Sequence, residues 1–111
     1  MDPLIPDKQI GKIYKEAAVA ARMLREKCSR VALVLDKDDP AAELMSEYQQ
    51  VCLRFQKKAE KAADMVLMIL NDGALRDYCQ SFDKVFKQFV DLAQKIEHDV
   101  NTLENQSAST H

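Results

Sequence analysis

Apolar residues recur every three or four positions through three long stretches of the sequence, and this spacing constrains the fold more than any other feature. In the first stretch the series begins with Ile10, Tyr14 and Ala17 and ends at Leu35. An α-helix turns about 100° per residue, so such spacing places these side chains on one face. A helix with one apolar face must bury it against other helices, and the spacing therefore predicts a helical bundle.

Each stretch carries one such seam of apolar residues, and a single charged residue, Lys58, interrupts the second seam. The seam positions are Ile10, Tyr14, Ala17, Ala21, Leu24, Cys28, Val31 and Leu35; then Leu44, Tyr48, Val51, Phe55, Lys58, Ala62, Met65 and Ile69; and finally Leu75, Tyr78, Phe82, Val85, Phe89, Leu92 and Ile96. Apolar neighbours such as Cys52 and Phe86 widen the seams, so that each helix can pack against two others.

Two short segments separate the three stretches. Asp36-Lys-Asp-Asp-Pro40 places Asp39 as an N-cap before a proline at the first helical position. In Asn71-Asp-Gly73, Gly73 is expected to take the left-handed conformation that closes a helix, and Asp72 is expected to cap the next one. Each segment therefore predicts the end of one helix and the start of another.

The predicted fold is all-α, an antiparallel up-down-up three-helix bundle with helices of roughly 30 residues. We expect helices over about 7–36, 40–71 and 74–104, and a disordered polar tail over 105–111. With 111 residues, 47% of them apolar, the chain has the size of one domain, residues 1–104. Whether it is a complete protein or the N-terminal domain of a longer one stays open.

No motif of a catalytic site is found in the sequence. The only two glycines, Gly11 and Gly73, are too far apart for the glycine-rich loops that bind phosphates. Outside the tail the one histidine is His98, which falls off the apolar seam and is expected to face solvent. Because no base is expected beside a buried nucleophile, we predict that the chain is not an enzyme and needs no cofactor.

The three cysteines, Cys28, Cys52 and Cys79, are odd in number and widely spaced. This is not the pattern of a disulfide framework, and it favours a reducing compartment, so we expect a cytoplasmic protein. Cys28 and Cys52 are interpreted as small buried apolar side chains. His98 is expected at a similar depth in the bundle, but it points outward and no fourth ligand accompanies the three residues, so no metal site is expected.

The net charge and the distribution of basic residues constrain the class of partner. Sixteen basic and eighteen acidic residues give a net charge of −2, so no overall positive field favours nucleic acid. Basic residues nevertheless gather in two stretches, which comprise Lys12, Lys15 and Arg22 in the first helix and Arg54, Lys57, Lys58 and Lys61 in the second. Such stretches are usually solvated faces; alternatively they attract an acidic protein or anionic lipid headgroups.

The run Met65-Val-Leu-Met-Ile-Leu70 is apolar around the whole helix, although only one side of it can face the core. The candidate partner-binding residues are Met65, Leu67, Met68 and Leu70. They could receive an amphipathic helix from a partner or from a second copy of the chain. In a purely structural alternative, Leu4 and Ile5 of the same chain cover this run.

These observations predict a non-enzymatic protein-protein interaction module of a cytoplasmic adaptor or scaffold. Its partner is expected to dock a helix on the apolar surface, while the neighbouring basic residues steer acidic partners toward it. Two alternatives remain: a membrane-surface module that binds anionic lipid through the basic stretches, and a homodimeric structural bundle.

Overall fold

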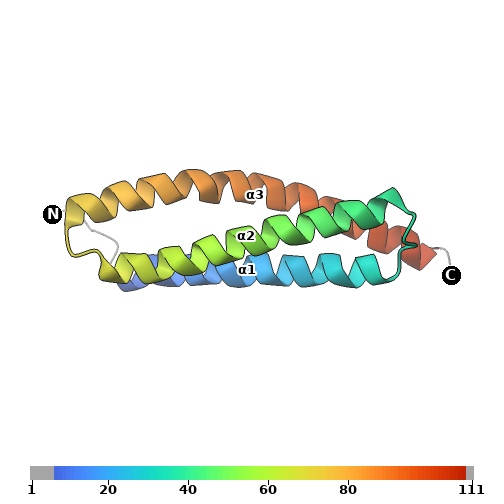
Figure 1. Cartoon of the computed structure of the whole chain (residues 1–111), viewed down its shortest axis with the longest axis horizontal. Coiled ribbons are helices and arrows are strands. Elements are labelled where there is room, and N and C mark those ends of the chain that lie inside the picture. Colours follow the sequence, from blue (N-terminus) through green and yellow to red (C-terminus); the bar gives the residue numbers. More distant parts are fainter. Residues whose placement is uncertain (1–6, 110–111) are drawn as a thin grey trace.

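The computed structural model describes residues 7–109, which form three α-helices joined by short connections (Figure 1). They are α1 (Asp7–Leu33), α2 (Pro40–Met68) and α3 (Asp72–Ser109). Successive helices run in opposite directions along one long axis, and the molecule measures 59 × 22 × 18 Å. The chain is therefore an all-α, up-down-up three-helix bundle, as the spacing of apolar residues predicted.

The start of α2 follows the predicted capping. Asp39 has an extended backbone, and its carboxylate accepts a hydrogen bond of 2.9 Å from the amide of Ala41. Pro40 occupies the first turn, where its missing N–H removes no helical hydrogen bond. Glu43 adds a negative charge near the positive end of the helix dipole.

The connection between α2 and α3 corrects a prediction. Gly73 does not have a positive φ and lies in the first turn of α3, so it does not close α2. Asn71 is the cap instead of Asp72, because its side-chain oxygen accepts hydrogen bonds from the amides of Gly73 (2.8 Å) and Ala74 (3.1 Å). α2 ends earlier, with Ile69 in an extended conformation.

The other helix ends also differ from the predicted bounds. α1 ends at Leu33, before the predicted residue 36. α3 continues through Ser109, so that 105–109 of the predicted tail are helical. No glycine or proline follows Gly73 in the sequence, and nothing there interrupts a helix. Thr110 and His111 lie outside the described residues.

α1 and α2 are the most closely packed pair of helices. A Cβ added to Gly11 of α1 would lie only 3.6 Å from the carbonyl oxygen of Ala63. The buried residues shared by this interface are mostly alanines, namely Ala18, Ala21, Ala59, Ala62 and Ala63. Small side chains allow two helix backbones to approach closely, which accounts for the short separation.

α3 packs against this pair through aromatic rings. Phe55 of α2 stacks on Phe89 of α3, with ring centroids 4.0 Å apart and planes inclined by 2°. Phe82 meets Tyr14 of α1 edge to face at 4.6 Å, and Phe86 approaches Phe55 edge to face at 6.0 Å. Large rings therefore fill the space between α3 and the other helices, whereas alanines fill the space between α1 and α2.

A second cluster closes the bundle near the connection of α1 and α2. Its fully buried members include Met45 and Ile96, and Phe89 packs against both this cluster and the aromatic one. Tyr48 is buried here, and its hydroxyl donates a 2.6 Å hydrogen bond to the Asp99 carboxylate. Because a buried hydroxyl needs a partner, this bond fixes the relative position of α2 and α3 at that end.

Candidate docking groove

The buried face of α2 is turned toward α1 relative to the predicted seam. Four of the buried side chains directly follow a predicted seam residue: Met45, Cys52, Ala59 and Val66 are buried in place of Leu44, Val51, Lys58 and Met65, whereas Tyr48, Phe55 and Ala62 are buried as predicted. The physical reason is the alanine interface, since close packing on α1 draws Ala59 and Ala63 inward. The flank of α2 toward α3 is consequently left partly exposed.

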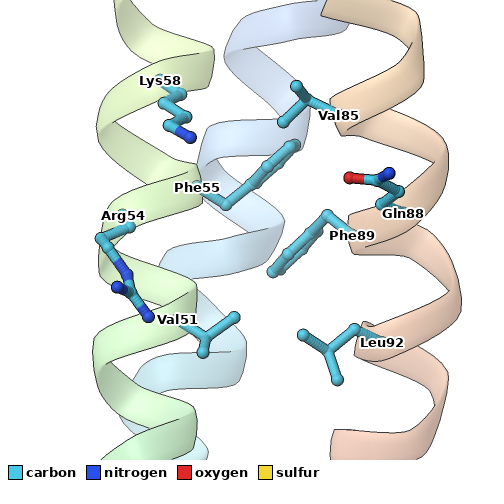
Figure 2. A pocket seen from close by; sticks show the side chains of 8 residues that line it. All are labelled: Val51, Arg54, Phe55, Lys58, Val85, Gln88, Phe89 and Leu92. Atoms are coloured by element: carbon cyan, nitrogen blue, oxygen red, sulfur yellow. The ribbon is translucent and has the colours of Figure 1, made fainter.

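A groove follows this flank, between α2 and α3 (Figure 2). It consists of two hollows of about 250 and 360 Å³ that adjoin, because Lys58 and Val85 line both. The remaining lining residues are Val51, Arg54, Phe55, Gln88, Phe89 and Leu92 in the first hollow and Lys61, Met65, Tyr78, Ser81 and Phe82 in the second. From Val51 to Met65 the groove follows α2 for roughly 20 Å.

The floor of the groove is apolar and includes a stacked pair of aromatic rings. Figure 2 shows Phe55 and Phe89 extending toward each other from α2 and α3. The same stacked pair also lines a smaller hollow of about 210 Å³ between α1 and α3, beside Phe86 and Val90. The two rings thus act as a spacer that separates a groove on one side of α3 from a groove on the other.

The two rims of the α2–α3 groove differ in charge. Arg54, Lys58 and Lys61 line it from α2, whereas the polar residues that line it from α3 are uncharged, namely Tyr78, Ser81 and Gln88. In the described part of the chain, no carboxylate lines either hollow. The groove therefore combines an apolar floor with one basic rim.

The structure separates the four apolar residues proposed for partner binding. Met65 is half-buried and lines the groove. Met68 is 71% exposed and lies about 60° around the helix from Met65, on the same side. Leu67 is 55% exposed and points about 160° away from Met65, while Leu70 is 96% exposed beyond the end of α2. They do not form one patch, because neighbours on a helix face different directions.

The basic residues are divided as well. Arg54, Lys58 and Lys61 are brought together, and Lys57 is exposed on α2 without lining the groove. The three basic candidates of α1, namely Lys12, Lys15 and Arg22, are exposed and line neither hollow. Arg22 pairs with Glu26 at 3.8 Å. Leu4 and Ile5, which were considered as a cover for the run 65–70, lie outside the described residues.

Sequence reasoning missed the groove residues of α3. Val85, Phe89 and Leu92 were assigned to the core as seam positions, but all three are only half-buried and line the groove. The available signal was Lys58, because a charged residue at a seam position indicates that this part of the seam meets water.

The two fully buried thiols have raised pKa values. Burial raises the pKa of the Cys28 thiol to about 11 and that of Cys52 to about 12, so both are protonated and weakly nucleophilic at neutral pH. His98 is exposed. Among residues 7–109, no group of histidine, cysteine and acidic side chains is arranged to hold a metal ion.

Within that same range, none of the three helices has the length and apolar character needed to cross a membrane. No known protein family, curated protein or solved structure matches the chain.

Proposed function

We propose that the chain is a non-enzymatic protein-interaction module that binds an amphipathic helix of a partner protein in the α2–α3 groove. The observation that supports this proposal is the continuous apolar groove made by the two adjoining hollows. The docked helix lies along α2 and α3 as a fourth helix and completes the packing that the spacer rings Phe55 and Phe89 leave open.

The chemistry of the groove suits this mode of recognition. Val51, Val85 and Leu92 are apolar side chains that retain partial contact with water in the isolated chain. A partner helix removes this area from water, at about 25 cal/mol per Å² of apolar surface. A length of roughly 20 Å accommodates about four helical turns, enough for apolar anchors at the i, i+3, i+4 and i+7 spacing.

The same proposal extends to the cellular role. Modules that bind a helix without chemistry are typical of adaptors and scaffolds, and we propose that this chain works in such a protein. The free cysteines Cys28, Cys52 and Cys79 fit a reducing compartment such as the cytoplasm.

The test begins with a display library of single helices that share an apolar i, i+3, i+4, i+7 stripe and are randomised elsewhere. Helices selected on the chain are synthesised and titrated by fluorescence polarisation. We expect Val85→Asp to weaken binding at least about tenfold, because it places a charge in the apolar floor. Val90→Asp is the matched control, since Val90 is 39% exposed and lines the hollow on the other side of α3.

Circular dichroism establishes that both variants fold. If Val85→Asp unfolds the chain, Gln88→Trp replaces it, because Gln88 is exposed and a larger side chain there fills the groove. Equal binding to the wild type and both groove variants contradicts the proposal. A dimer in light scattering that Val85→Asp dissociates also contradicts it, because the occupant is then a second copy of the chain.

A further inference from the structure

We infer that the occupant of the groove is an acidic amphipathic helix, with carboxylates along the flank that faces α2 and uncharged residues along the flank that faces α3. This inference rests on the proposed function and adds the charge chemistry of the partner. It is carried by the arrangement of three cations on one rim of the groove.

The three cations form one stripe. Arg54, Lys58 and Lys61 stand at positions i, i+4 and i+7 of α2, so they lie on one face of the helix and extend over roughly 10 Å of its length. All three are exposed and line the groove. A helix docked alongside α2 can present carboxylates at the same spacing.

Within the described part of the chain, none of these cations makes an ion pair or a hydrogen bond. Lys58 has Arg54 four residues before it and Lys61 three residues after it, and like charges at these spacings destabilise a helix. Its other neighbours on the same face, Phe55 and Ala62, are uncharged. The stripe therefore opposes the stability of the isolated bundle, and an acidic helix relieves this repulsion.

The rim on α3 determines which flank of the docked helix carries the carboxylates. The groove-lining Ser81 and Gln88 carry no charge. The exposed charges next to them on α3 are mixed in sign, with Lys84 between Asp77 and Asp91, so a carboxylate on the α3 side of the occupant meets no stripe of cations there. A helix with carboxylates on both flanks loses hydration on one of them without compensation. The asymmetry thus selects helices with a single acidic flank and fixes which side of the helix meets α2.

The composition of the selected helices is the first test. We expect aspartate and glutamate to be enriched on one flank of the apolar stripe, and affinity to fall as sodium chloride is raised, because the charged rim is solvent-exposed. The chain with Arg54→Glu, Lys58→Glu and Lys61→Glu should bind the acidic peptides at least about tenfold more weakly. It should bind matched peptides with lysine in place of the flank carboxylates more tightly than the wild type does.

Lys15→Glu serves as the matched control for Lys58→Glu, because Lys15 is exposed on α1, does not line the groove and is not a helix neighbour of the stripe. It makes the same charge change as Lys58→Glu alone, and we expect less than about a twofold effect on the Kd. An equal loss with Lys15→Glu and Lys58→Glu means that only net charge acts, and it overturns the inference.

A stability measurement separates lost binding from lost folding. Lys58→Glu replaces two repulsive pairs by two attractive ones, so its thermal unfolding midpoint should rise while its affinity for acidic helices falls. Helices that lose affinity with Val85→Asp but show no acidic flank and no response to charge reversal overturn this inference and leave the proposed function standing. Helices that bind Val85→Asp as tightly as the wild type overturn both this inference and the proposed function.

Discussion

Cys28 and Cys52 are fully buried in the cluster that includes Tyr48, and this environment determines their chemistry. Burial disfavours the thiolate and raises the pKa of both thiols. Cys79 differs, because it is only partly buried, at the edge of the aromatic cluster. The three thiols therefore report separately on the core and on the partly open part of the bundle.

We expect a thiol reagent added to the native chain at neutral pH to modify Cys79 first. Cys28 and Cys52 should react only as fast as the bundle opens, because they are both protonated and inaccessible. Peptide mapping by mass spectrometry at successive times gives the order of modification. Modification of Cys28 as fast as Cys79 shows that the second cluster is not packed as described.

The same burial predicts an effect of alkaline pH. An unfolded thiol loses its proton near its ordinary pKa of 9.0, whereas folded Cys28 and Cys52 keep theirs to about 11 and about 12. Above pH 9 the unfolded chain thus binds fewer protons, and the free energy of unfolding falls as pH rises toward 12. Burial and then the Asp99 hydrogen bond also raise the pKa of Tyr48 to about 12, which acts in the same direction. Urea unfolding from about pH 8 to about pH 10.5 checks this, and a constant free energy contradicts it.

At the level of the helices, the small side chains at the α1–α2 interface determine how closely these two helices approach. Gly11 is buried there, within α1, and its φ is not positive. A Cβ at this position meets the Ala63 oxygen at 3.6 Å and the Val66 Cγ2 at 3.7 Å, which is ordinary contact. The interface therefore has room for a methyl group at this position.

Gly11→Ala should accordingly stabilise the chain by about 0.5–1 kcal/mol, because alanine loses less backbone entropy in a helix and no atom must move. Gly11→Leu should destabilise it by about 1–3 kcal/mol, since it forces α1 and α2 apart. Denaturant unfolding at constant m-value measures both changes. If Gly11→Ala instead lowers the free energy of unfolding, α1 and α2 lie closer together than described here.

The sequence predicted the existence of these helices better than their rotation. Asp39 and Pro40 carry their own capping signal, so the start of α2 could be predicted from local residues. The rotation of α2 was not predicted, because Lys58 indicates only that this part of the seam meets water, and the alanines of α1 determine which side of α2 is buried. A packing choice of this kind involves residues far apart in the sequence.

For the whole molecule, alanines on one side of α2 and aromatic rings on the other give unequal helix spacings. This inequality creates the groove, and it could not be read from a single seam. Arg54, Lys58, Lys61 and Met65 were predicted as binding residues and do line the groove. Leu67 was predicted with them because the apolar run is continuous in sequence, but the turn of the helix directs it elsewhere.

The most direct test of the account is a titration of the isotope-labelled chain with a selected acidic helix, followed by the backbone amide signals. Binding in the groove predicts the largest shifts along its two walls, at residues such as Lys58 of α2 and Val85 and Gln88 of α3. The amide of Ala20, in the hollow between α1 and α3, should change little. Shifts concentrated around Ala20, or confined to residues 67–70, contradict the assignment of the α2–α3 groove as the docking site.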